Sequence, residues 1–162
     1  MFGEGEVVAT PWRGTSPAVK DEEIDVIAWR PRADRSPGTT YMLAQVASGD
    51  NWMSKPIAGM PISNFHRNWF LRTPASTASA AIFIPHAVPP VDVSGTRRER
   101  MDALTMQYGM IFDRLRIPPL TQAGLDLHSQ GRQEIYIERA EDIASIGHWV
   151  IDQIQALQGA CQ

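Results

Sequence analysis

Two short apolar segments near the N-terminus predict neighbouring strands. Residues 24–30 are rich in β-branched and aromatic side chains, which favour extended backbone, and Pro31 ends the segment. Residues 41–47 form a second segment of the same kind, after a polar, turn-forming stretch over residues 32–38. Together the two segments predict an antiparallel hairpin.

Beyond the hairpin, the spacing of apolar residues alternates between the repeat of a helix and that of a strand. The predicted elements are an interrupted helix over residues 52–70, a buried strand over 80–85, a helix over 96–115, a strand over 133–138 and a helix over 140–157. One more short element is expected at residues 6–9. The helix between the second and third strands suits a parallel crossover. The pattern therefore predicts an α/β fold, with a mixed central sheet flanked by helices.

Composition and charge limit the class of protein. The chain of 162 residues fits one domain, expected over residues 20–162 after an arm at 1–19, and 43% hydrophobic residues can form a core. The net charge of −3 gives no general attraction for nucleic acid, so binding would need a local basic patch, a metal or a partner. The single cysteine, Cys161, excludes an internal disulfide and fits a reducing compartment.

Membrane and nucleotide-binding classes lack support in the sequence. No apolar run approaches the roughly 20 residues that span a bilayer, and the acidic N-terminus does not resemble a signal peptide. We therefore expect a cytoplasmic protein with no membrane partner. The glycine-rich motifs of P-loop, dinucleotide-binding and α/β-hydrolase enzymes do not occur, which argues against those three classes.

Two polar residues interrupt the apolar hairpin. Asp25 lies in the first predicted strand and Gln45 in the second. A half-buried carboxylate is costly unless it is paired, hydrogen-bonded or bound to a metal. Side chains on adjacent strands lie roughly 5 Å apart, and oxygen ligands at that spacing suit Mg²⁺ or Mn²⁺. A metal held there can activate water and stabilise the charge on a phosphodiester.

The same hairpin resembles a known family. Residues 20–29, with the sequence KDEEIDVIAW, resemble the DGGIDVIA segment of Mrr-like members of the PD-(D/E)XK nuclease superfamily. Residues 44–49, AQVASG, resemble the QxK strand that follows it. Over residues 20–118 the chain is similar to uncharacterised bacterial proteins that carry this nuclease-like core. The resemblance implies a restriction-endonuclease-like fold and a Mg²⁺-dependent DNA endonuclease of restriction or defence type.

The resemblance also implies roles for individual residues. Asp25, Gln45 and the backbone carbonyl of Val46 would bind the metal. The family's lysine, which positions or activates the attacking water, corresponds to Ala47 here, so Lys55 is the candidate for that role. The structural alternatives are a solvated aspartate at a sheet edge for Asp25 and a cross-strand hydrogen bond for Gln45.

Other departures from the family leave two alternatives open. Glu22 and Glu23 stand where the family segment has two glycines, and few residues precede position 20 to form the family's leading helix. One alternative is a catalytically degenerate module that binds nucleic acid or a partner protein, which Ala47 favours. The other is a subunit that acts only with a defence-system partner. A homodimer would suit cleavage of both DNA strands.

Four arginines are candidates for binding nucleic acid. Arg97 and Arg98 open the helix predicted over 96–115, at the end where the helix dipole disfavours positive charge. With Arg114 and Arg116 they predict a phosphate-binding face. A solvated start of the helix is the alternative for the first two.

Overall fold

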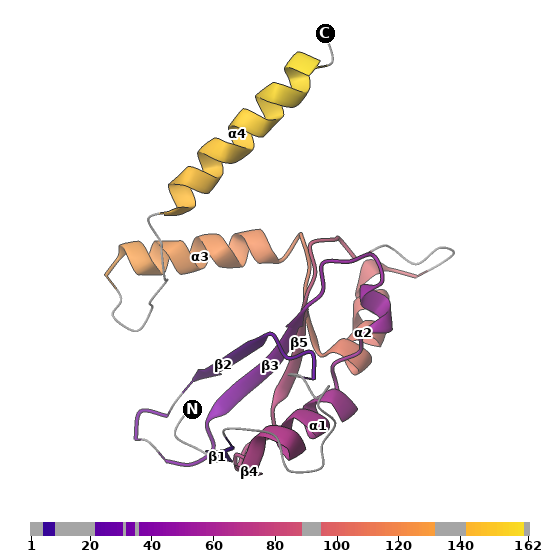
Figure 1. The fold of residues 1–162 in the computed structure, drawn as a ribbon, viewed down its shortest axis with the longest axis vertical. Coiled ribbons are helices and arrows are strands. Elements are labelled where there is room, and N and C mark those ends of the chain that lie inside the picture. Colours follow the sequence, from indigo (N-terminus) through magenta and orange to yellow (C-terminus); the bar gives the residue numbers. More distant parts are fainter. Residues whose placement is uncertain are drawn as a thin grey trace. The chain divides into compact units, whose positions relative to one another are not determined.

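The computed structural model describes residues 5–8, 22–30, 32–34, 36–88, 95–131 and 142–160. The chain divides into two compact units, Met1–Pro118 and Pro119–Gln162. The first unit contains every strand of the described residues, and the second contains most of helix α3 (Ile117–Ser129) and all of α4 (Ile143–Ala160). The bar in Figure 1 relates these elements to residue numbers.

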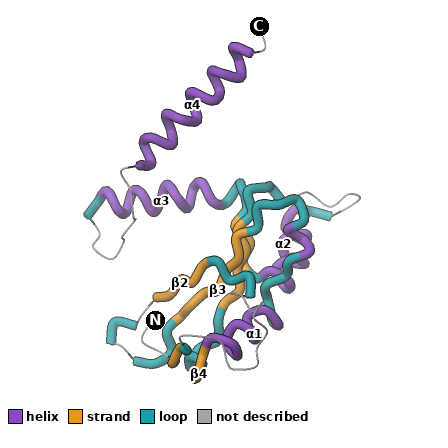
Figure 2. Tube along the Cα trace, in the orientation of Figure 1, coloured by secondary structure: helices purple, strands orange, loops and turns teal. Residues whose placement is uncertain are grey.

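A mixed four-stranded sheet, with strand order β2-β3-β5-β6, forms the centre of the first unit. β2 (Val26–Arg30) is antiparallel to β3 (Thr40–Val46), and β3 is parallel to β5 (Ser79–Phe83). β5 is in turn parallel to β6 (Met110–Phe112). The predicted hairpin and parallel crossover are therefore confirmed, and the chain is an α/β protein with a mixed sheet. Figure 2 distinguishes its helices from its strands along the chain.

A smaller two-stranded sheet joins the N-terminal segment to the crossover. β1 (Glu6–Val7) pairs antiparallel with β4 (Phe70–Arg72), and β1 is the short element expected at residues 6–9. The interrupted helix expected over residues 52–70 is a 3₁₀ helix, η1 (Trp52–Ser54), followed by α1 (Met60–Trp69). Pro61 lies in the first turn of α1, where a residue without an N–H is tolerated.

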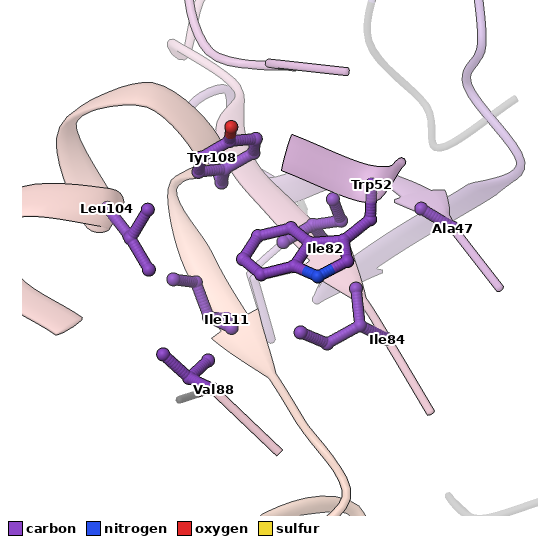
Figure 3. Close-up of a cluster of buried hydrophobic side chains, with 8 residues drawn as sticks. All are labelled: Ala47, Trp52, Ile82, Ile84, Val88, Leu104, Tyr108 and Ile111. Carbon is purple, nitrogen blue, oxygen red and sulfur yellow. The ribbon is translucent and has the colours of Figure 1, made fainter. Parts of the chain in front are cut away.

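Helices α1 and α2 (Arg97–Tyr108) pack on the same face of the central sheet. Leu43 of β3 clusters with Phe65 of α1. Gln45 points to the same face as Leu43, and its register partner Ile82 clusters with Leu104 of α2. The buried residues of the second cluster, drawn in Figure 3, are Ala47, Trp52, Ile82, Ile84, Val88, Leu104, Tyr108 and Ile111.

The prediction of a helix up to Leu115 is wrong, because α2 ends at Tyr108. Gly109 follows with a φ of 68°, and a Cβ at this position would lie 2.1 Å from the carbonyl oxygen of Ala80. The glycine lets the backbone pass directly against β5 and turn into β6. Phe112, which fits the helical repeat in the sequence, is therefore a strand residue.

The prolines at 118 and 119 do not end α2, which already stops at Tyr108, and they instead begin a helix that the sequence pattern did not indicate. Both lie in the first turn of α3, where their fixed φ and missing N–H are compatible with a helix. The helix predicted over 140–157 is confirmed as α4. The strand predicted over 133–138 lies outside the described residues. Within the described ranges, no helix is both long and apolar enough to cross a membrane.

Candidate functional site

Asp25 and Val46 meet where β2 begins and β3 ends. The N–H of Val46 donates to Asp25 Oδ2 at 2.7 Å, and the N–H of Asp25 donates to the carbonyl of Ala44 at 2.9 Å. Since the N–H and C=O of one strand residue point to the same side, the Val46 carbonyl lies on the side of β3 that carries Asp25. Asp25 is exposed, so its carboxylate is accessible. The structure thus brings together two of the three groups expected to bind metal.

The third expected ligand, Gln45, is buried, with an exposed fraction of 3%. Its Nε2 donates to Glu23 Oε2 at 2.8 Å, so the side chain makes a hydrogen bond of the kind considered as its structural alternative. The amide oxygen Oε1 is the atom that would serve as a metal ligand. The hydrogen bond also holds the Glu23 carboxylate beside Gln45, near the end of β3.

Glu22 and Glu23 form a left-handed turn just before Asp25. Their φ angles are 53° and 62°, a conformation that costs roughly 1 kcal/mol or more for a residue with a Cβ. Asn68 of α1, which is buried, donates from Nδ2 to Glu22 Oε1 at 2.9 Å, as Gln45 does to Glu23. These two hydrogen bonds offset the strain. The sequence signal for this turn is that both residues occupy glycine positions of the resembling family segment.

The groups around Asp25 suit a Mg²⁺ site in which the protein supplies only a few of the ligands. Among the described residues, no group of three or more His, Cys, Asp or Glu side chains is placed to hold a metal ion. The expected set supplies one carboxylate from Asp25, the carbonyl of Val46 and the amide oxygen of Gln45. Mg²⁺ is often bound through one or two carboxylates while it keeps several waters and contacts substrate phosphate. The donor set is compatible with that mode of binding.

Ala47, at the position where the resemblance leads one to expect a lysine, lies in the core. Ala47 has an exposed fraction of 3% and clusters with Trp52 and Ile82, as Figure 3 shows. Lys55 follows η1, whose Trp52 N–H donates to the carbonyl of Gly49 in the loop after β3 at 3.1 Å. The half-buried Lys55 is not joined to Asp25 by a hydrogen bond or ion pair in the described part of the chain.

Asp113, directly after β6, is fully buried and organises the neighbouring loops. Its carboxylate forms an ion pair with Arg97 and accepts hydrogen bonds from the N–H groups of Val88 at 3.3 Å, Leu115 at 3.2 Å and Arg116 at 3.1 Å. Burial alone would raise the pKa of Asp113, but the Val88 hydrogen bond and the Arg97 guanidinium outweigh it and hold the pKa below its ordinary value. Arg97 is therefore engaged in the fold as well as being a candidate for phosphate binding.

Arg114 and Arg116 are exposed and anchored to the backbone. Arg114 Nε donates to the carbonyl of Pro85 at 2.9 Å, and Arg116 Nη1 donates to that of Ile111 at 3.1 Å. Both follow β6, at the edge where the carboxyl ends of the parallel strands β3, β5 and β6 meet, and ligands of open α/β sheets bind at such edges. Arg98 is exposed on α2, and within the described residues its side chain makes no such hydrogen bond to the backbone.

Two histidines near the sheet have distinct structural contacts. His86 Nε2 lies 3.1 Å from the carbonyl of Ser48, which can only accept, so Nε2 carries the proton and Nδ1 is the acceptor in the neutral ring. This bond joins the segments that follow β3 and β5. His66 Nε2 lies 3.0 Å from the hydroxyl of Tyr41, and burial lowers the pKa of His66.

The edge of the sheet therefore combines an exposed carboxylate at Asp25, a neighbouring backbone carbonyl at Val46 and two anchored arginines. Polar and charged groups of this kind are suited to binding a phosphate with the help of a divalent cation. Comparisons of the chain with protein-family models, with curated proteins and with solved structures found no match.

Proposed function

We propose that this chain is a Mg²⁺-dependent DNA endonuclease with a restriction-endonuclease-like fold. The observation that carries the proposal is the placement of Asp25 against the last residue of β3, with the Val46 carbonyl on the same side. The order of elements supports it, because the hairpin that bears Asp25 and Gln45 is followed by a helical crossover to a parallel strand. The left-handed turn at Glu22 and Glu23 supports it too, since glycine occupies these positions in the resembling segment.

In this proposal each residue at the sheet edge has a defined task. Asp25, the Val46 carbonyl and Gln45 Oε1 hold Mg²⁺, which when bound polarises a phosphodiester and lowers the pKa of a bound water. Arg114 and Arg116 bind the phosphates on either side of the bond to be cut. Lys55 orients the attacking water, a task that Ala47 cannot perform.

The test is DNA cleavage by the Asp25→Asn protein. Asparagine keeps an oxygen that accepts the Val46 N–H, so the hairpin is expected to remain intact while the charge that binds Mg²⁺ is lost. Cleavage of plasmid and single-stranded DNA with Mg²⁺ or Mn²⁺ should disappear, and the thermal unfolding curve should stay close to that of the wild type. Asp34→Asn, which changes an exposed aspartate in the loop between β2 and β3, is the matched control and should cut normally. Wild-type cleavage rates in Asp25→Asn would refute the proposed site.

A non-catalytic module of the same fold is the second candidate function. Two observations favour it: Ala47 lies in the core, and the Gln45 amide is hydrogen-bonded to Glu23. Such a module would bind nucleic acid in a salt-dependent way and cut nothing with any divalent ion. Wild-type protein that binds but does not cut selects this candidate, whereas activity that returns only with an added partner indicates a subunit of a larger defence system.

A further inference from the structure

Three side chains form a continuous stack on the face of the sheet opposite to α1 and α2. The rings of Phe83 and Phe112 are parallel to within 11°, with centroids 4.6 Å apart. The guanidinium carbon of Arg116 lies over the Phe112 ring, 4.9 Å from its centroid. Since Phe83 covers one face of that ring, the guanidinium lies against the other. The order of the stack is therefore Phe83, Phe112, Arg116.

The stack continues a row that begins at the candidate metal site. Val46, Phe83 and Phe112 are register partners on β3, β5 and β6, so their side chains project from the same face. Val46 is 52% exposed, and its N–H is the group that binds Asp25. At the usual spacing of strands the row spans about 10 Å from β3 to β6.

The guanidinium at the end of the row is fixed in place and accessible. The N–H of Arg116 donates to the carbonyl of Asp113 at 2.9 Å, and Nη1 donates to the carbonyl of Ile111 at 3.1 Å. The side chain is exposed, and β6 is the last strand of the sheet in the described part of the chain. The outer face of the guanidinium is consequently available to a planar ligand, while its remaining N–H groups can donate to an anion.

We propose that this stack is a base-binding platform, and that the substrate of the nuclease proposed above is single-stranded nucleic acid. An unpaired base stacks on the outer face of Arg116, in line with the Phe112 ring. Bases bind to guanidinium planes and aromatic rings in this way when they are unpaired, whereas the bases of a duplex are stacked on one another and unavailable. Positive charge favours the same ligand, because Arg114 is anchored beside the platform and can contact the phosphates of that strand. The inference rests on the proposed function in so far as both require nucleic acid.

The test compares Arg116→Lys with Arg67→Lys. Lysine keeps the positive charge but removes the planar group, so it separates stacking from phosphate binding. Binding is measured by fluorescence anisotropy in the presence of EDTA, so that no cleavage occurs. The probes are a labelled DNA strand of about 20 nucleotides, the RNA strand of the same sequence and the DNA duplex. We expect Arg116→Lys to weaken binding of the single strand by about fivefold or more, the lower end of what one stacked base contributes. Arg67→Lys changes an exposed arginine of α1, on the other face of the sheet, and should leave binding of the single strand as in the wild type.

Two further measurements make the result specific. Phe112→Leu should reproduce the loss seen in Arg116→Lys, with folding checked by thermal unfolding; if this variant is unfolded, Arg116→Lys alone decides. Trp29→Leu, which removes a partly exposed aromatic residue from the opposite face of the sheet, should bind like the wild type.

The inference is overturned if Arg116→Lys binds single strands as the wild type does, or if the duplex binds as tightly as the single strand. A single strand that binds more tightly as DNA than as RNA, or the reverse, supports the inference and shows which nucleic acid the platform prefers. Its failure is distinguishable from that of the proposed function, because cleavage is tested separately by Asp25→Asn. Arg116-dependent binding without cleavage keeps the platform and rejects hydrolysis, whereas wild-type protein that binds no nucleic acid rejects both.

Discussion

The N–H of Val46 donates to the carboxylate of Asp25 across 2.7 Å, and this bond links the start of β2 to the end of β3. The same strand residue projects its side chain into the row that leads to Phe83 and Phe112. One backbone position therefore connects the carboxylate expected to hold a metal with the surface proposed to bind a base. A ligand that contacts both would lie across the carboxyl edge of the sheet.

The turn before Asp25 provides the first prediction. Glu23→Ala and Glu23→Gly both lose the hydrogen bond from Gln45, but alanine keeps the strain of a left-handed φ whereas glycine relieves it. The alanine variant should therefore be less stable than the glycine variant by roughly 1 kcal/mol. Glu23→Gln retains an acceptor for the Gln45 amide and should be close to the wild type. Urea unfolding of the three variants measures the differences, and an alanine variant as stable as the glycine variant would show that the turn is not left-handed in solution.

The lysine of the family motif provides the second prediction. Ala47→Lys places a charged side chain among Trp52 and Ile82, where it has no partner, and should destabilise the protein by about 3 kcal/mol or more without increasing cleavage. Lys55→Met should abolish cleavage while changing the free energy of unfolding by less than about 0.5 kcal/mol, because Lys55 is only half-buried and forms no ion pair within the described residues.

These two lysine variants are informative together. Cleavage that increases in a stable Ala47→Lys protein would mean that position 47 faces the substrate, contrary to its packing. Unchanged cleavage in Lys55→Met would leave the water-orienting role to another group.

The hairpin and the parallel crossover were predictable because their strands are long enough to show a pattern. The segments at 24–30 and 41–47 are bounded by turn-forming residues, and a helix-length connection precedes the apolar run at 80–85. β6 was not predictable, because it has three residues and its apolar members continue the helical repeat of α2. The sign that the helix ends is Gly109, but one glycine does not reveal the backbone of Ala80 that it must pass.

The candidate site, like the fold, was predictable from the sequence only in part. Asp25 and Gln45 stood out because they are polar residues within apolar strands, and such an exception is visible in a sequence. The hydrogen bonds from Gln45 to Glu23 and from Asn68 to Glu22 join residues that are 22 and 46 positions apart, so spacing along the chain gives no indication of them. The stack of Phe83 on Phe112 depends on the register of β5 with β6, which could not be assigned while β6 was taken for helix.

The buried carboxylate of Asp113 gives the last prediction, on stability against acid. Its pKa is below the ordinary value of 3.8 in the folded protein, so the unfolded chain binds the proton more readily. The stabilisation from the carboxylate is thus complete above pH 3.8 and is lost as the pH falls through the lower pKa of the folded state. Asp113→Asn removes the charge that Arg97 faces and should lower the free energy of unfolding at pH 7 by on the order of 3 kcal/mol.

The pH dependence distinguishes this ionic role from simple packing. Urea unfolding of wild type and Asp113→Asn should give a difference that is constant between pH 7 and pH 5 and shrinks below about pH 4, where Asp113 of the unfolded wild-type chain takes up a proton. Asp102→Asn, an exposed aspartate of α2, should show little difference at any pH. A difference for Asp113→Asn that stays the same down to pH 3 would mean that the asparagine is destabilising through its shape and hydrogen bonds, because the charge on Asp113 would then contribute nothing to stability.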